Sequence, residues 1–514
     1  MRRSLRIAAL ERILLSSLLV ACAAQTAGAL GLEDVARRAK QLAASAYADP
    51  RGSVPQWLLD LNYDQYRDIR FRPERALWGD RKLPFSVQFF HPGFFYDRAV
   101  SIHVVSSFGA VSPVSFSPDQ FDYGRNEFES RVPQDLGYAG FRIHYPIKST
   151  SYHDEVAAFL GASYFRAVGR DQVYGLSARG VAIDTALSSG EEFPWFREFW
   201  LVQPAPGAQE LTLFALLDSP SATGAYRFVV APGPQTHVDV EMRLFPRRTL
   251  GKLGIAPLTS MFLHGESAAG NVADYRPEVH DSDGLLVSAS SGEWLWRPLE
   301  NPQDLSVTSF ELVNPRGFGL VQRDRAFDHY QDIEARPDLR PSAWVQPKGD
   351  WGAGRVELVE IPTRNDTNNN VVAYWVPQAA ASTNTPISYA YSVFWYGDDR
   401  VRPPGGRSVA TRQDGGTHPK ARRLVVDFEG EALRRLPADA VVEGRVSMIP
   451  SRGASAGLPQ TAELLEQQVI RNPATGGWRL VLQVNSPDDP VELRAFLRHG
   501  ADAVSETWSY LLVP

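Results

Sequence analysis

Cysteine is almost absent from the chain, which has a single one, Cys22, among 514 residues. Beyond that position the sequence offers no disulfide, no thiolate nucleophile and no cysteine metal site. It also lacks a basic excess, with a formal net charge of −6, and this excludes the usual nucleic-acid-binding class. Neither a phosphate-binding Gly-rich loop nor a His-Glu-x-x-His zinc motif occurs. We therefore expect no metal, no cofactor and no nucleic-acid partner.

The first 29 residues have the pattern of a bacterial secretory leader. Arginines at positions 2, 3 and 6 precede an apolar run over 13–24 that is too short to cross a bilayer. Small residues at 27–29 then form a cleavage site, so we expect a periplasmic protein cleaved after Ala29. Two alternatives stay open: lipidation at Cys22, and twin-arginine rather than Sec export through Arg2 and Arg3.

The mature chain reads mainly as β-strand. Residues 236–244 alternate polar and apolar, and 211–217, 226–230, 355–359 and 388–395 are rich in β-branched and aromatic residues. Helices are predicted over 32–46, which carries an apolar stripe, and over 153–160, with Asp154 as its cap. Because strands and helices do not alternate, a parallel α/β fold is excluded, and we predict a large antiparallel β-sandwich.

A domain boundary is predicted where a charged stretch runs into prolines and glycines, at 398–407. The segments beyond it are short and strand-like, at 423–428, 440–448, 478–484, 491–497 and 507–512. They predict a small immunoglobulin-like sandwich over 408–514, after a large domain over 30–397.

Polar and aromatic residues gather in three stretches, 275–296, 322–332 and 347–352. Glycoside cleavage requires two carboxyl groups about the scissile bond, and the 12 tryptophans and 18 tyrosines offer flat surfaces for sugar rings. Taken alone, each stretch is more often a solvated loop or a set of structural ion pairs than a catalytic site. The residues by themselves indicate only a sugar-binding β-protein.

Several longer strings are more specific. Residues 160–166 read Leu-Gly-Ala-Ser-Tyr-Phe-Arg, 172–180 read Gln-Val-Tyr-Gly-Leu-Ser-Ala-Arg-Gly, and 506–510 read Glu-Thr-Trp-Ser-Tyr. With 218–226 and 256–262, they closely resemble the periplasmic glucan biosynthesis protein G/D family over about residues 30–514. The resemblance implies a large sandwich like the galactose mutarotase fold, followed by an immunoglobulin-like domain. It also implies a role in making osmoregulated periplasmic glucans, with β-1,2-glucan and the inner-membrane glucan synthase as partners.

Some members of that family resemble inverting β-1,2-glucanases, and the match carries their roles onto this chain. Asp281 takes the position of the general base, and Asn369 stands where the family has its general acid. Asp366 is the alternative acid in the same loop. Apart from the resemblance, the loops rich in polar and aromatic residues predict the substrate-binding residues Glu293, Trp294, Arg323, Asp324, Tyr330 and Trp351. Three functions stay open: an enzyme that trims or rearranges β-glucan, a non-catalytic glucan-binding protein, and a structural partner of the synthase.

Overall fold

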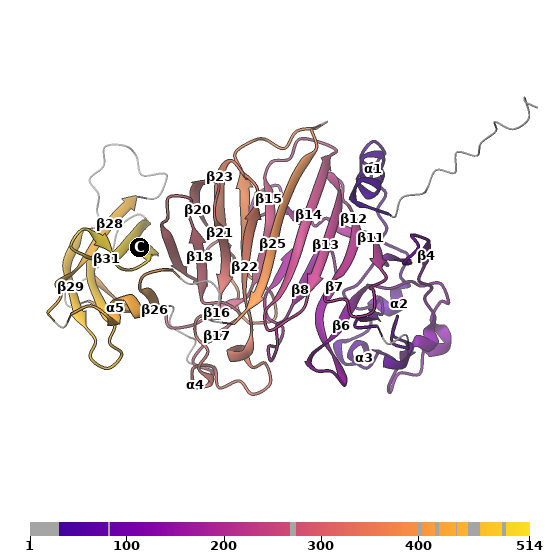
Figure 1. Ribbon diagram of the computed structural model, residues 1–514, viewed down its shortest axis with the longest axis horizontal. Coiled ribbons are helices and arrows are strands. Elements are labelled where there is room, and N and C mark those ends of the chain that lie inside the picture. The colour runs from indigo at the N-terminus through magenta and orange to yellow at the C-terminus, as the bar shows by residue number, and fades with distance from the viewer. Residues whose placement is uncertain are drawn as a thin grey trace, which may run out of the picture.

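The computed structural model describes residues 30–513 except 81–82, 268–273, 384, 398–402, 417–420, 438, 451–462 and 486–489. The predicted leader and Cys22 therefore lie outside the described residues. Within them the chain is mainly β, and no helix is long and apolar enough to cross a membrane. Figure 1 shows a central sandwich, with the C-terminal strands at one end and the short N-terminal helices at the other.

Two large sheets form the sandwich in the described part of the chain. The first has ten strands, in the spatial order β2 (Ser86–Phe90), β6 (Gly140–Ser149), β7 (Tyr152–Leu160), β8 (Tyr164–Ala167), β9 (Ser177–Arg179), β15 (Leu253–Ser260), β24 (Val371–Pro377), β23 (Ala353–Glu360) and β20 (Ser306–Val313), with β10 (Val181–Ile183) beside β15. The second has fifteen: β28 (Val442–Pro450), β31 (Val491–His499), β33 (Thr507–Leu512), β19 (Trp294–Pro298), β18 (Gly284–Ser288), β21 (Gly317–Val321), β22 (Ser342–Lys348), β25 (Ile387–Tyr396), β14 (Thr236–Pro246), β13 (Ala222–Ala231), β12 (Leu211–Asp218), β11 (Trp195–Val202), β3 (Ser101–Val105) and β4 (Val111–Pro113), with β32 (Asp502–Ala503) beside β31.

Aromatic side chains from both sheets meet in the core between them. Phe159 lies 5.2 Å from Phe228 and Phe165 lies 5.9 Å from Trp395, measured between ring centroids. Each pair joins a strand of the ten-stranded sheet to a strand of the fifteen-stranded one. Alternate residues of these strands therefore face the core, which confirms the predicted antiparallel sandwich.

The C-terminal strands form a smaller sandwich that continues the large one. A four-stranded sheet of β26 (Arg407–Gly415), β27 (Ala421–Glu429), β30 (Trp478–Asn485) and β29 (Leu464–Arg471) shares a hydrophobic core with β31 and β33. Strand β33 also pairs in parallel with β19, where Trp508 lies opposite Trp296. The C-terminal sandwich is thus joined to the large sheet by backbone hydrogen bonds as well as by side-chain packing.

The helix predicted over 32–46 is confirmed as α1 (Leu32–Ala43). Its buried residues Val35, Ala36 and Ala39 pack on the outer face of the fifteen-stranded sheet, where Thr223 donates to the carbonyl of Ala39 at 2.7 Å. The remaining helices are short: α2 (Gln56–Leu59), α3 (Tyr63–Arg67), α4 (Phe327–Tyr330) and α5 (Glu431–Arg434). Two small ribbons, β1 (Arg70–Phe71) with β5 (Phe121–Asp122) and β16 (Phe262–His264) with β17 (Val279–His280), complete the described elements.

The helix predicted over 153–160 is wrong, because that segment is strand β7. It pairs antiparallel with β6 on one side and with β8 on the other. Residues 156–159 are all buried, so the apolar run has no polar face, and a run this short does not separate strand from helix by periodicity. Asp154, predicted as the helix cap, instead accepts the backbone N–H of Lys148 across the hairpin at 3.2 Å.

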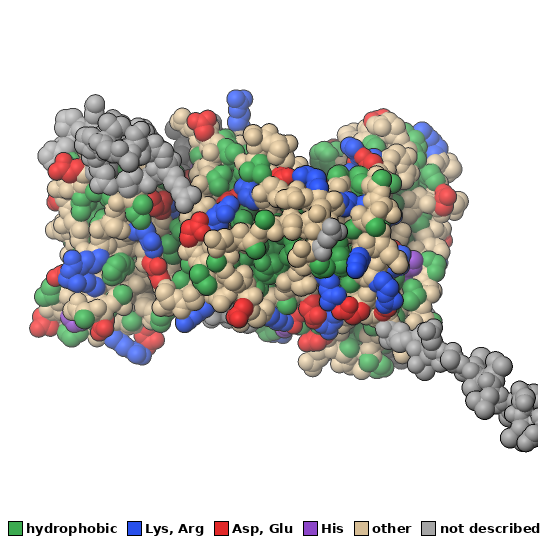
Figure 2. Space-filling view, turned by 90° about the horizontal axis from the view of Figure 1, so that it is seen from above, with side chains coloured by type: hydrophobic (Ala, Val, Ile, Leu, Met, Phe, Trp, Pro, Cys, Tyr) green, Lys and Arg blue, Asp and Glu red, His purple; other side chains and the backbone are tan. Residues whose placement is uncertain are grey.

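Basic and acidic side chains are interspersed over the face of the molecule seen in Figure 2. This distribution matches the modest formal net charge of −6. A broad basic stripe, which a nucleic-acid-binding surface requires, is not present on that face.

Candidate functional site

Asp281 lies in a short loop between β17 and β18, at one end of β15. Its backbone N–H donates to the carbonyl of Met261 at 2.8 Å, and the hydroxyls of Ser282 and Ser260 lie 2.9 Å apart. The residue is only 7% exposed. The position of this carboxylate is therefore set by the backbone on both sides of it.

Arg340, in the turn before β22, forms an ion pair with the Asp281 carboxylate. Burial raises the pKa of Asp281, although the positive charges of Arg340, His280 and Arg166 act in the opposite direction. The carboxylate thus binds a proton more readily than one in water, while a guanidinium orients it. This combination suits a base that acts on a bound hydroxyl or water.

The loop over residues 361–370 reaches the same end of β15. Asn370 is buried, where its amide accepts the N–H of Phe262 at 2.8 Å and donates to the carbonyls of Phe262 and Ile361. Its backbone N–H donates to Ser260 at 3.1 Å. Asn369, one residue earlier, is exposed. Because Asp281 and Asn370 bond to consecutive residues of one segment, the structure brings the predicted base and the predicted acid position to one region.

Asp366, the alternative acid, is held by Arg276. The two side chains are joined at 2.8 Å, and the same guanidinium contacts Asp274 at 2.8 Å and Asp332 at 3.3 Å. The hydrogen bonds from Arg276 lower the pKa of Asp274 to about 2. Arg276 therefore ties together three loops, and Asp366 is one of its partners.

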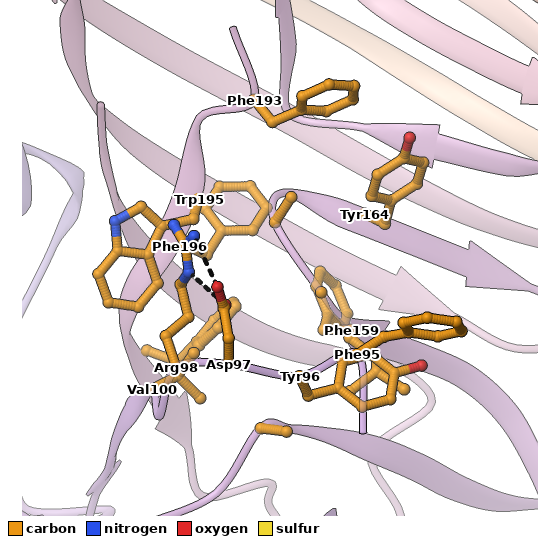
Figure 3. A pocket seen from close by; sticks show the side chains of 15 residues that line it. Phe95, Tyr96, Asp97, Arg98, Val100, Phe159, Tyr164, Phe193, Trp195 and Phe196 are labelled. Carbon is orange, nitrogen blue, oxygen red and sulfur yellow. Dashed lines mark hydrogen bonds and ion pairs between the residues drawn. The ribbon is translucent and has the colours of Figure 1, made fainter. Parts of the chain in front are cut away.

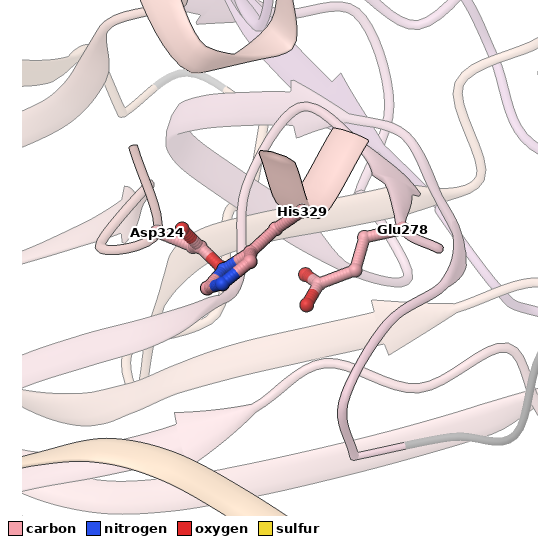
Figure 4. Close-up of side chains that lie close together, drawn as sticks. All are labelled: Glu278, Asp324 and His329. Atoms are coloured by element: carbon pink, nitrogen blue, oxygen red, sulfur yellow. The ribbon is translucent and has the colours of Figure 1, made fainter. Parts of the chain in front are cut away.

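A second polar cluster lies beside Asp281. Single oxygen or nitrogen atoms of Glu278, Asp324 and His329 all lie within 4.8 Å of one another, and Figure 4 shows the three side chains turned toward each other. His329 pairs with Asp324, and the Nε2 atom of His280 lies 2.7 Å from Glu278. Burial alone would favour neutral His280, but the hydrogen bond with Glu278 and the charge of Asp283 raise its pKa. The cluster is a chain of carboxylates and imidazoles, and no ion is needed to explain the pairs already formed.

The family of the chain is decided by comparison with known proteins. A family model described as periplasmic glucan biosynthesis protein, MdoG, matches residues 30–512. The chain belongs to this periplasmic glucan biosynthesis family. It is 52% identical to the glucans biosynthesis protein G of Ralstonia nicotianae, over 97% of this chain and 99% of the relative.

Two further relatives of the same name agree. The protein of Pseudomonas aeruginosa is 46% identical, over 97% of this chain and 96% of its own, and that of Sodalis glossinidius is 46% identical, over 94% and 93%. A crystal structure of the Slr1438 protein from Synechocystis aligns with 62% of this chain and 93% of its own, at 9% identity and a TM-score of 0.15. That last similarity is too weak to bear on the fold.

Two predicted binding residues, Tyr330 and Asp324, lie in the polar cluster that contains His280, the residue before Asp281. Tyr330 is fully buried, with its ring 5.2 Å from that of His280, and its hydroxyl accepts from Gln322 at 2.5 Å. Asp324 belongs to the cluster of Figure 4. Tyr330 thus packs beneath the polar cluster and is not accessible to a ligand, whereas the side chain of Asp324 is partly exposed.

The other four predicted residues have contacts that differ from those of Tyr330 and Asp324. Glu293 accepts from Thr507 at 2.7 Å, Trp294 stacks on Trp344 at 5.8 Å, and Arg323 forms an ion pair with Glu506, so these three lie where the C-terminal strands join the large sheet. Trp351 is 5% exposed and belongs to the main core, with its indole N–H donating to Ala390 at 3.3 Å. The structure does not bring Glu293, Trp294 and Trp351 together with Asp281, whereas Arg323 lines one pocket with Asp324, Glu278 and His280, the residue before Asp281.

Two charged residues of the site were missed by sequence reasoning. Arg340 pairs with Asp281, and Arg166 adds a second positive charge nearby. Arg166 is the last residue of the 160–166 string, and its place in that string was the one sequence feature that could have marked it. Arg340 follows a turn and shows no pattern that marks it, since its partner is 59 positions away in sequence.

Glu360, the residue before the 361–370 loop, predicts that the free energy of unfolding depends on pH. Burial raises the pKa of Glu360 to about 7, from 4.5, with Arg297 opposing the shift. Below pH 4.5 this glutamate is neutral in both folded and unfolded chains, so its contribution is fully present there. This contribution is lost as the pH rises toward 7, because the glutamate of the unfolded chain then ionises readily while burial still opposes ionisation in the folded chain. We expect Glu360→Gln to exceed the wild type in free energy of unfolding at pH 8, by on the order of 3 kcal/mol at most.

Urea denaturation at pH 5 and pH 8 measures this difference. Glu311→Gln, on an exposed position of β20, is the matched control and should show no such pH-dependent gain. An equal effect of Glu360→Gln at both pH values would contradict the assignment.

Proposed function

We propose that this protein binds the β-1,2-glucan backbone of osmoregulated periplasmic glucans at the site around Asp281. Membership of the periplasmic glucan biosynthesis family supports a role in that process. The observation that carries the finer proposal is the buried Asp281–Arg340 pair beside the loop that holds Asn369. A carboxylate and a guanidinium provide an acceptor and several donors, which suit the hydroxyl groups of a neutral sugar chain.

The proposal favours binding over hydrolysis. Asn369 can hydrogen-bond a glycosidic oxygen but carries no proton acidic enough to transfer to it. Asp366 is engaged by Arg276, and it would have to leave this ion pair to serve as an acid. Trimming or rearrangement of the backbone is the second candidate, because the raised pKa of Asp281 suits a base.

Two further parts of the proposal concern the place of action. Export to the periplasm with cleavage after Ala29 supplies the compartment in which such glucans are made. Contact with the inner-membrane glucan synthase through residues 408–514 would deliver the nascent chain to the Asp281 site. Mass spectrometry of the mature N-terminus decides between Ala29 cleavage and lipidation at Cys22.

Calorimetric titration with linear β-1,2-glucan tests the binding. We expect the wild type to bind, and Asp281→Asn to weaken binding by roughly tenfold or more, because the amide loses the charge that Arg340 orients. Asp304→Asn, which changes an exposed carboxylate in the loop before β20 in the same way, is the matched control and should bind nearly as the wild type does. Absence of binding by the wild type, or equal affinity of wild type and Asp281→Asn, would overturn the proposal.

A further inference from the structure

A pocket lined mainly by aromatic side chains opens at the start of β11, apart from the cluster around Glu278. It has a volume of about 270 Å³, and its walls come from the segment before β3, the turn between β7 and β8, and the first half of β11. Figure 3 shows Phe95, Tyr96, Tyr164, Phe193 and Trp195 around the opening. The volume is sufficient for a single hexose ring.

Two rings at this pocket are exposed and held outward. Phe95 is 80% exposed and Phe193 is 51% exposed. The turn that carries Phe95 is fixed by mutual backbone hydrogen bonds between Gly93 and Tyr96, and by the N–H of Phe94 donating to Leu58 at 2.8 Å. Phe94 has a φ of 54°, which is unfavourable for a bulky residue and persists only where its surroundings impose it. The backbone thus maintains a strained turn that presents an apolar ring to water.

Polar groups in the pocket suit a neutral ligand. Arg98 and Asp97 form an ion pair at 2.8 Å, and Arg98 lies over the ring of Trp195 at 5.6 Å. Trp195 is 5% exposed, and its indole N–H has no hydrogen-bond partner in the described part of the chain. The pocket therefore combines aromatic faces with the donor groups of Arg98 and the acceptor oxygens of Asp97, whose ion pair adds no net charge. A pyranose, which has apolar faces and a rim of hydroxyl groups, meets all of these features.

Strand β8 connects this pocket to the Asp281 site. Phe165 packs in the core, 5.2 Å from Phe228, so its neighbours Tyr164 and Arg166 both point to the outer face of the ten-stranded sheet. Tyr164 lines the pocket, and the ring of Tyr174 lies 4.2 Å from the Arg166 guanidinium. Burial raises the pKa of both Tyr96 and Asp281, and the positive charge of Arg166 opposes the rise in each.

We propose that the aromatic pocket is a distal subsite for one glucosyl unit of a glucan whose chain also occupies the Asp281 site. The chain runs along the outer face of the ten-stranded sheet, past Arg166. The inference rests on the proposed function, since it assigns a second contact to the same ligand. It adds that recognition depends on glucan length, because only a long chain reaches both places.

Titration with linear β-1,2-glucans of increasing length tests this subsite. In the wild type, affinity should rise once the chain is long enough to reach the pocket, and the fluorescence of Trp195 should change at the same length. In Phe95→Ala/Phe193→Ala, affinity for long chains should fall roughly tenfold, while that for short chains stays as in the wild type. Both positions are exposed, so the fold is retained, and the thermal unfolding midpoint verifies this.

Phe108→Ala, at a 96% exposed position in the turn between β3 and β4, is the matched control and should bind all lengths like the wild type. Equal affinity of the double variant and the wild type for long chains would overturn the subsite alone. Binding of a fatty acid in the pocket with no change in glucan affinity would also overturn the subsite alone. A wild type that binds no glucan of any length would overturn the proposed function and the subsite with it.

Discussion

Asn369→Asp should increase the release of reducing ends from linear β-1,2-glucan by about 10²–10⁴-fold over the wild type, which should show little activity. An inverting glycosidase requires a carboxylic acid to protonate the leaving oxygen and a carboxylate to activate water. Asp281 supplies a buried carboxylate of raised pKa. Asn369 nearly matches aspartate in shape, and the anchoring of Asn370 fixes the backbone next to it. The substitution should therefore place a carboxylic acid at the position that the family resemblance assigns to the general acid, without moving the loop.

Asn368→Asp is the matched control, since it adds the same charge at an exposed position one residue earlier. It should leave the activity at the wild-type level. Asp366→Asn, made in the wild type, tests the alternative acid. Strong wild-type turnover that survives Asp366→Asn would contradict the argument, because neither carboxyl would then be needed.

Arg323→Met should lower the free energy of unfolding by about 3–5 kcal/mol, the cost of leaving a buried charge without its partner. The Arg323 guanidinium is joined to Glu506 at 2.6 Å, with side-chain exposures of 5% and 0%. It also lies over the ring of Trp296 at 3.5 Å and donates to the carbonyl of Ser408 at 2.6 Å. These contacts join the large sheet to the C-terminal strands. Without them, the two sandwiches should unfold in separate transitions.

Arg494→Met provides the control at the same junction. Arg494 pairs with Glu293 at 2.6 Å, but both side chains are partly exposed, so its removal should cost only about 0–1 kcal/mol. Guanidinium denaturation followed by tryptophan fluorescence measures both variants. Adding Glu506→Gln to Arg323→Met should recover part of the loss, since the buried charge is then removed. If Arg323→Met instead abolished glucan binding and was about as stable as Arg494→Met, the result would contradict a structural role and support the binding role predicted from the sequence.

The sequence could predict much of the fold because its signals are local. The alternation over 236–244 became β14, and the apolar stripe at the N-terminus became α1. The signal failed at 153–160, where a short apolar run is compatible with a helix or a strand. Pairing with β6 and β8, its neighbours in the chain, decided that segment, and such pairing cannot be read from the residues of 153–160 alone.

The sequence by itself determined the family, because family membership depends on strings of adjacent residues, and from the same strings it predicted the roles of Asp281 and Asn369. Only the tertiary structure decided which charges meet. It paired Asp281 with Arg340 across 59 positions, and it placed Glu293 and Arg323 against the C-terminal strands. The physical reason is that burial and Coulomb interactions depend on distance in space, and long-range strand pairing sets that distance.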